Sequence, residues 1–420
     1  MPAGKHGGKK ADTQEIAKLK DLDEVQAEIV YDDEEEAEQD EIRRVKIPKA
    51  VYRVGIILIV VILGLILWIN RANLTPGNIW NWVKQQTMGT GQGDGYPVPV
   101  TGNNVSASNF VHDGSSLAVL SDTAFTMLNS TGREIASVRH SFDDPALVNA
   151  GGNYLLYNAG STGYLLQSGS ETLVQGNAES DLLAGAVSQS GRFALGRRGS
   201  DCASRLEVYL KNGTLQYDYQ FGQDYITAVA LNSAGTKGAV CTVRSEKGEL
   251  VSTITILDFT QTTPVSEYRA QGTLLLDVSW TENDFLYAVG DTSLYSAKAS
   301  DFSFVEYSYG GRQVTAYDLE NNKAFVSVSP YEHAGACTLM VYSGADAPVE
   351  ISTDDRVKSI SAFGGTVGVL VGNEVAFFDS ATGQEQGSVT AGMDVRSIAL
   401  ENESRAYILG VSEIRKVSIS

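Results

Sequence analysis

Two acidic residues, Asp277 and Asp318, are candidates for chemistry because each lies in or directly after a short apolar segment that we predict to line a central channel. Enzymes that cleave glycosidic bonds direct two or three carboxyl groups into one cleft. No motif pairs Asp277 with Asp318 at a known spacing. Carboxylate catalysis on a glycan is therefore one alternative for this chain.

Nucleophilic hydrolysis needs a Ser or Cys together with a His and a carboxylate. After residue 95 the chain contains His112, His140 and His333, and no G-x-S-x-G motif that would mark a nucleophile elbow. We expect each of these histidines on a surface loop. The sequence predicts no catalytic residue of this type.

Two acidic pairs, Asp143-Asp144 and Asp354-Asp355, have the oxygen ligands that Ca²⁺ prefers. They stand alone, without the D-x-[DN]-x-[DN]-G, H-E-x-x-H or C-x-x-C patterns of known metal sites. Acidic residues are also common in turns. We expect turn residues here, and neither a metal ion nor a cofactor; a phosphate-binding glycine motif before a helix is absent too.

The chain has only three cysteines, Cys202, Cys241 and Cys337, which excludes a disulfide-dense scaffold. Cys241 falls in a predicted strand, where we expect a small buried side chain. Cys202 falls in a loop of the adjacent repeat, so a Cys202–Cys241 disulfide stays open as an alternative. Cys337 has no evident partner.

A unit of about 41 residues recurs from residue 96 onward, and this repeat must position the groups above. Each unit contains short apolar segments of five or six residues, such as NYLLY, KGAVC, AFTMLN and VAFFDS, separated by glycine or polar turns. Four strands per unit and this period are typical of a β-propeller blade. The first turn of each unit lies at Gly114, Gly151, Gly191, Gly235, Asn283, Asn322, Gly365 and Glu403.

These markers predict an all-β, eight-bladed propeller, with a seven-bladed ring as the alternative. The eighth unit ends at Ser420 after its third strand, whereas residues 96–101, YPVPVT, precede the first unit. This segment can supply the missing outer strand and close the ring. Its two prolines suit an outer strand, because proline donates no hydrogen bond to a neighbouring strand.

An apolar run, VGIILIVVILGLILWI at 54–69, predicts a transmembrane helix over 51–70. About 20 helical residues span the hydrocarbon core of a bilayer. About 50 residues precede the run and no cleavage site follows it, so we interpret it as an uncleaved signal-anchor. Five basic residues flank its N-terminal side and two its C-terminal side, which predicts a cytoplasmic N-terminus. The five are Arg43, Arg44, Lys46, Lys49 and Arg53.

The anchor divides the chain into four parts. Residues 1–50 form a cytoplasmic tail that we expect to be largely disordered, with an acidic run at 32–41 and a possible short helix at 12–30. Residues 71–95 comprise a juxtamembrane helix and a glycine-rich linker. Residues 96–420 form the extracytoplasmic propeller.

The four-stranded units resemble those of WD40-like and quinoprotein-like propellers. The segments TGREIASV and TGQEQGSV resemble the turn of the quinoprotein repeat, but the tryptophan of that repeat and the Trp-Asp pair of WD40 proteins are both missing. More specifically, GDGYPVPVTG, LAVLSDTAFTMLNSTGRE and NYLLYNAGSTGYLL resemble a bacterial family of single-pass membrane proteins with a propeller ectodomain. That resemblance covers nearly the whole chain and implies fold and topology, but no activity.

Charge narrows the choice of partner. The chain carries a formal charge of −19; the first 95 residues hold 12 Lys+Arg and 15 Asp+Glu, which leaves 20 and 36, a balance of −16, for the propeller. An acidic surface excludes nucleic acid as a partner, because phosphate binding depends on Lys and Arg.

We therefore expect a non-enzymatic binding or scaffold protein of the cell membrane, with the propeller facing an envelope protein or glycan. Two alternatives stay open. One is an enzyme acting on an envelope glycan, and the other is a transmembrane sensor with a short cytoplasmic output segment at 12–30.

Overall fold

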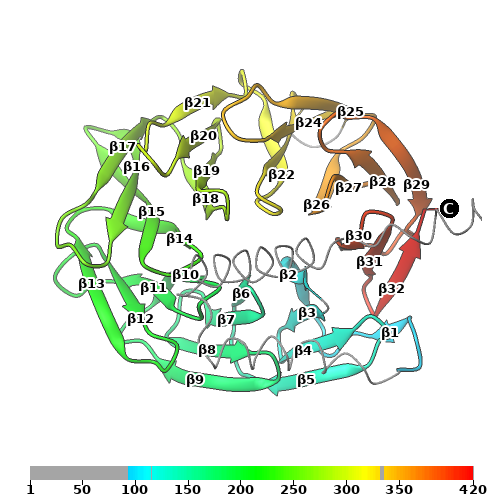
Figure 1. Ribbon diagram of the computed structural model, residues 1–420, viewed down its shortest axis with the longest axis horizontal. Coiled ribbons are helices and arrows are strands. Elements are labelled where there is room, and N and C mark those ends of the chain that lie inside the picture. The colour runs from blue at the N-terminus through cyan, green and yellow to red at the C-terminus, as the bar shows by residue number, and fades with distance from the viewer. Residues whose placement is uncertain (1–92, 115, 332–334, 420) are drawn as a thin grey trace, which may run out of the picture. The chain divides into compact units, whose positions relative to one another are not determined.

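The computed structural model describes residues 93–114, 116–331 and 335–419, and these form eight four-stranded antiparallel sheets arranged as the blades of a propeller (Figure 1). The prediction of eight blades is confirmed and the seven-bladed alternative is wrong. The predicted tail, transmembrane helix and nearly all of the predicted linker lie outside the described residues. Within the described ranges, no helix has the length and apolar character needed to cross a membrane.

In the first four blades, strands follow one another from the channel outward. Blade 1 contains β2 (Val105–Asp113), β3 (Ser116–Ser121), β4 (Ala124–Asn129) and β5 (Glu134–Arg139); blade 2 contains β6 (Pro145–Ala150), β7 (Asn153–Asn158), β8 (Gly163–Ser168) and β9 (Glu171–Asn177). Blade 3 contains β10 (Leu182–Val187), β11 (Phe193–Arg198), β12 (Ser204–Tyr209) and β13 (Leu215–Phe221); blade 4 contains β14 (Tyr225–Leu231), β15 (Lys237–Glu246), β16 (Glu249–Asp258) and β17 (Ser266–Gln271).

The next three blades repeat this order, and the eighth takes its outer strand from the start of the propeller. Blade 5 contains β18 (Leu275–Trp280), β19 (Phe285–Gly290), β20 (Ser293–Lys298) and β21 (Val305–Ser308); blade 6 contains β22 (Gln313–Asp318), β23 (Ala324–Ser329), β24 (Cys337–Tyr342) and β25 (Val349–Thr353). Blade 7 contains β26 (Val357–Phe363), β27 (Thr366–Val371), β28 (Glu374–Asp379) and β29 (Glu385–Thr390); blade 8 contains β30 (Ser397–Asn402), β31 (Arg405–Leu409), β32 (Glu413–Ser418) and β1 (Val98–Pro99).

The burial of each strand follows from its place in the blade. Both faces of a middle strand pack against neighbouring blades, and β3 and β23 are accordingly buried along almost their whole length. Outer strands such as β5 and β17 alternate exposed and part-buried residues. The hydrophobic core is therefore distributed between adjacent blades, and each pair of neighbours buries its own apolar cluster.

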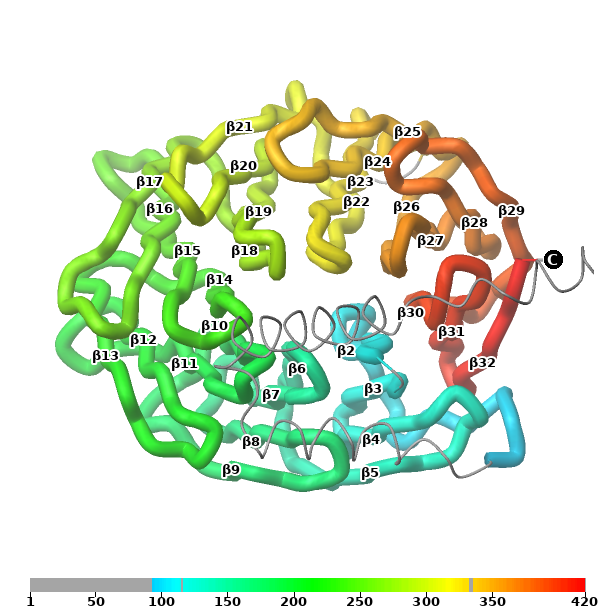
Figure 2. The backbone as a smooth tube through the Cα atoms, viewed as in Figure 1, coloured from blue at the N-terminus to red at the C-terminus, as the bar shows by residue number. Residues whose placement is uncertain are grey.

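The ring closes through β1, which pairs antiparallel with β32 (Figure 2). Tyr96 packs on Tyr407 of β31 with ring centroids 5.2 Å apart, and its hydroxyl donates to the Asn129 carbonyl in blade 1 at 3.0 Å. Arg396 in turn donates to the Asn104 side chain across the same seam, at 3.1 Å. The predicted closure by residues 96–101 is confirmed.

Candidate functional site

A cavity of about 1250 Å³ lies on the axis of the ring, and residues of all eight innermost strands line it. Each blade has four antiparallel strands, so every innermost strand begins at the same end of this channel. We call that end the entry mouth and the opposite end the exit mouth. This shared direction places residues from equivalent strand positions at the same depth in the channel.

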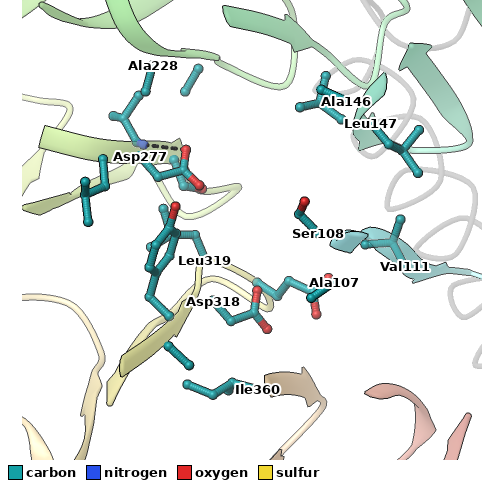
Figure 3. A pocket seen from close by; sticks show the side chains of 18 of the residues that line it. Ala107, Ser108, Val111, Ala146, Leu147, Ala228, Asp277, Asp318, Leu319 and Ile360 are labelled. Carbon is teal, nitrogen blue, oxygen red and sulfur yellow. Dashed lines mark hydrogen bonds between the residues drawn. The ribbon is translucent and has the colours of Figure 1, made fainter. Parts of the chain in front are cut away.

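The wall mixes small and aliphatic side chains with hydroxyl, amide and charged groups from the innermost strands. Figure 3 shows the carboxyl groups of Asp277 and Asp318 directed into the space that Ala107, Ser108 and Val111 line from the other side. A concave wall that combines apolar and polar groups can both bury a ligand and orient it by hydrogen bonds.

The carboxyl groups occupy particular places on the strands. Asp277 follows a β-bulge in β18, where the pairing with β19 shifts between Leu275 and Asp277, and one of its oxygens accepts a hydrogen bond from the Val278 N–H at 2.8 Å. Bulges redirect the side chains next to them. Asp318 is the last residue of β22, and Glu320 lies in the turn after it, so both belong to the exit mouth.

The protein around these groups disfavours their charged forms. Asp277, Asp318 and Glu320 are each partly exposed to the channel but are otherwise surrounded by protein. Burial raises the pKa of Asp277 to about 6 and that of Glu320 to about 7. Burial, followed by the neighbouring Glu320 carboxylate, raises the pKa of Asp318 well above its usual range.

Charge is distributed unevenly along the channel. Arg312 and Lys358 stand at the beginning of β22 and β26, at the entry mouth. Both are engaged locally, since Arg312 donates to the Tyr309 carbonyl at 2.8 Å and Lys358 to the Gly372 carbonyl at 2.7 Å. The exit mouth carries Asp318 and Glu320. The entry mouth carries these two cations together with Asp291, which accepts from the Leu274 N–H at 2.8 Å next to the start of β18.

Turns between the first and second strands surround the exit mouth and are joined by hydrogen bonds from blade to blade. Most of these bonds join one turn to the next, whereas Gln189 of blade 3 donates to Glu282 of blade 5. The pairs are Gly152 with Asp113, Asn153 with Gln189, Ser190 with Ala234, Gln189 with Glu282, Glu282 with Asn322, Asn321 with Gly364, and Gly365 with Glu403.

The histidines do not form a site together. His112 lies within β2 rather than on a loop, half-buried with its ring centroid 5.6 Å from that of Tyr407, and burial lowers its pKa. The expectation of a surface loop was wrong for His112, because the end of β2 packs at the seam with blade 8. His140 lies in the loop before β6, half-buried against Phe142. His333 lies outside the described residues.

The two acidic pairs do not form a metal site. Asp143-Asp144 and Asp354-Asp355 are exposed in the connections that lead into blades 2 and 7. In the part of the chain that the structure describes, no group of three or more His, Cys, Asp or Glu is placed to hold a metal ion.

All three cysteines are free, so the Cys202–Cys241 disulfide that the sequence left open is not formed. Cys241 is fully buried, as expected, and burial raises the pKa of its thiol.

Sequence reasoning did not identify Glu320 or Tyr317, although both line the channel. Tyr317 occupies the wall with 37% of its surface exposed. A signal for Glu320 was present, since it lies two residues after Asp318 and directly before Asn321 and Asn322 of the same turn. Both asparagines adopt positive φ, 53° and 60°, which a tight turn commonly requires.

The fold and the axial channel define an eight-bladed, WD40-like β-propeller. Three solved structures are similar to the described ring. The computationally designed Ika8 protein is 13% identical with a TM-score of 0.54, and the match covers 78% of this chain and 98% of that one. Sqt1 of Saccharomyces cerevisiae and the C-terminal WD40 domain of Sif2 are each 11% identical with a TM-score of 0.55; each match covers 77% of this chain, with 100% of the Sqt1 chain and 97% of the Sif2 chain. At these identities the likeness concerns the fold alone.

The chain belongs to the family of unknown function DUF5711, whose sequence profile matches residues 96–419. The match covers the propeller and includes the segment that closes the ring. No curated protein matches the chain.

Proposed function

We propose that this protein is a membrane-tethered, extracytoplasmic binding module of the cell envelope, and that its axial channel receives part of an envelope protein or glycan. The observation that carries the proposal is the channel of about 1250 Å³, closed around its circumference by eight blades. Its wall combines aliphatic surface with hydroxyl and charged groups, and Asp318 and Glu320 lie together at the exit mouth. The apolar segment at 54–69 and the basic residues before it support the tether and its orientation.

A photo-crosslinking amino acid in the channel tests the proposal. In the full-length protein in its own membrane, the crosslinker replaces either Tyr317, which is 37% exposed on the channel wall, or Leu215, which is 50% exposed at the start of the outer strand β13. We expect a specific adduct from position 317 and none of the same mass from position 215. The same adducts from both positions, or none from position 317, would overturn the proposal.

The orientation has its own test. Protease added to intact cells should degrade residues 96–420 and leave a membrane-protected fragment that contains the N-terminal tail. Protection of the propeller in intact cells, with digestion only after lysis, would place it on the cytoplasmic side and overturn this part of the proposal.

A glycan-cleaving enzyme is the second candidate, and the carboxyl groups of Asp277, Asp318 and Glu320 in the channel favour it. Asp318 and Glu320 are in direct hydrogen-bonding contact, whereas glycosidase pairs are separated by about 5 to 10 Å so that the bond lies between them. Asp277 together with either Asp318 or Glu320 remains as a combination. Release of reducing ends from purified envelope glycan by the wild-type protein, abolished in D277N and E320Q, would establish the enzyme and replace the binding proposal.

A further inference from the structure

We propose that Asp318 and Glu320 form a proton-operated clasp that holds the exit-mouth turn of blade 6 against blade 7. The proposal goes beyond the binding function and does not depend on it. The turn in question comprises residues 319–323 between β22 and β23, and its partner is the end of β26 with the turn that follows it.

The two carboxyl groups contact each other directly. The Oδ2 atom of Asp318 is buried, and no N–H or O–H of the protein donates to it. Two ionised carboxylates are both acceptors and repel each other, whereas a pair that retains one proton has a donor for the bond. The contact is therefore favourable only while the pair holds a proton.

Glu320 also connects the pair to the next two blades. Its Oε2 atom accepts a hydrogen bond from the Ser361 hydroxyl of β26 at 3.5 Å, and the Ala362 N–H donates towards the same carboxyl group. Ser361 Oγ in turn accepts from the Leu400 N–H of β30 at 3.0 Å. Movement of Glu320 would thus disturb hydrogen bonds in blades 7 and 8.

The rest of the turn is docked on blade 7 by neutral or single-charge contacts. Asn321 donates to the Gly364 carbonyl, and Lys323 Nζ donates to the Ser380 hydroxyl at 2.6 Å. Neither contact compensates a second negative charge on the acid pair. These contacts hold the turn on blade 7 while the pair is protonated. When the pair is fully ionised, they only partly oppose movement of the turn away from blade 7.

The other charged groups that face the pair are negative. Asp277 of β18 acts on Asp318, and Asp113 at the end of β2 acts on Glu320. Among the ion pairs of the described residues, none includes Asp318 or Glu320, and the channel cations Arg312 and Lys358 lie at the entry mouth. Loss of the shared proton therefore adds repulsion without a balancing cation.

The direction of the pH effect follows from these pKa shifts. Both pKa values lie above those of an unfolded carboxyl, that of Glu320 at about 7, because burial disfavours the charged forms. Between about pH 4 and pH 7 the folded protein binds more protons than the unfolded one, so its stability decreases as pH rises through this window. The clasp is therefore closed at low pH and loosens as rising pH removes the protons of the pair.

Hydrogen exchange of the full-length protein in detergent, followed by mass spectrometry at pH 5.5 and 8.0, tests the clasp. After correction for the intrinsic pH dependence of exchange, we expect protection in peptides covering 319–323 and 361–365 to fall about tenfold or more at pH 8.0, since a shift of one pKa unit corresponds to a tenfold change in equilibrium. Peptides from blade 3 should not respond.

Variants identify the source of the response. In D318N the amide at position 318 donates to Glu320 without a titrating proton, so protection should stay high at both pH values. In E320Q the amide at position 320 donates to Asp318 instead, and this variant replaces D318N in the test if D318N does not fold. D354N removes an exposed acid from the connection into blade 7 and should behave like the wild type. Equal corrected protection of the wild type at both pH values would overturn the clasp, as would an unchanged pH response in D318N or E320Q.

Discussion

Replacing Arg197 with Met should destabilise the propeller more than any change at an exposed ion pair. The Arg197 side chain is only 4% exposed and donates to Glu207 Oε1 through Nε at 2.8 Å and through Nη2 at 2.6 Å; Glu207 is 9% exposed and also accepts from the Tyr209 hydroxyl. The substitution leaves the Glu207 charge buried without its cation. Such a loss costs about 3 to 5 kcal/mol.

Thermal unfolding of the full-length protein by circular dichroism measures the effect. An unfolding entropy of about 2.1 cal/mol/K per residue gives about 0.7 kcal/mol/K for a propeller of about 325 residues. R197M should therefore lower the Tm by about 4 to 7 °C. The other ion pair of Arg197, with Glu179, contributes little to this figure, because the Glu179 side chain is 82% exposed.

Two further variants separate charge burial from general damage. On the neighbouring strand β12, R205M removes the more exposed ion pair between Arg205 and Asp218 of β13, whose side chains are 20% and 36% exposed, and should cost less than about 1 kcal/mol. R197M/E207Q removes the stranded charge but keeps an acceptor for Tyr209, and should recover at least half of the loss. A Tm for R197M within about 1.5 °C of the wild type, or a double variant no more stable than R197M, would refute the reasoning.

Three other changes have defined outcomes. G368V places a side chain where a Cβ would lie 2.5 Å from the Leu400 Cδ1 atom of blade 8, and should lower stability by about 1 to 3 kcal/mol in chemical denaturation; an unchanged midpoint would contradict this. D277N should stabilise the protein by about 1 to 3 kcal/mol at pH 8 and not at pH 4, since burial raises the Asp277 pKa to about 6 and wild-type stability falls as pH rises between these values; equal melting shifts at both pH values would contradict it. V98D introduces a charge where β1 packs against the seam, and should increase hydrogen exchange in β32 before that in β28; equal increases in both strands would mean that β1 does not close the ring.

Much of the ring could be predicted because its strands are local. Segments such as Asn153–Asn158 and Ala124–Asn129 carry apolar side chains along their length and end in turns, so their positions follow from residue type. Closure by Val98–Pro99 followed from the count of strands and from the prolines, which fit an outer strand. These features need no knowledge of contacts between distant residues.

The candidate site could be predicted only in part. Asp277 and Asp318 were recognised as channel residues from their place on the innermost strands, but Glu320 was missed because it belongs to a turn. Its contact with Asp318 depends on how the turn folds back at Asn321 and Asn322. His112 was misplaced because its burial arises from Tyr407, which is almost 300 residues away in the chain.

By itself, the sequence determined the number of blades, the strand that closes them and the acidic balance of the propeller, because repeat period, turn residues and charge are properties of the chain. Only the tertiary structure decided that Asp318 and Glu320 share one environment, that hydrogen bonds join successive exit-mouth turns, and that the three cysteines are free. The physical reason is that the pKa of a buried carboxyl group, and the hydrogen-bond partner of a turn, depend on residues of neighbouring blades. Those residues come together only when the blades pack into the ring.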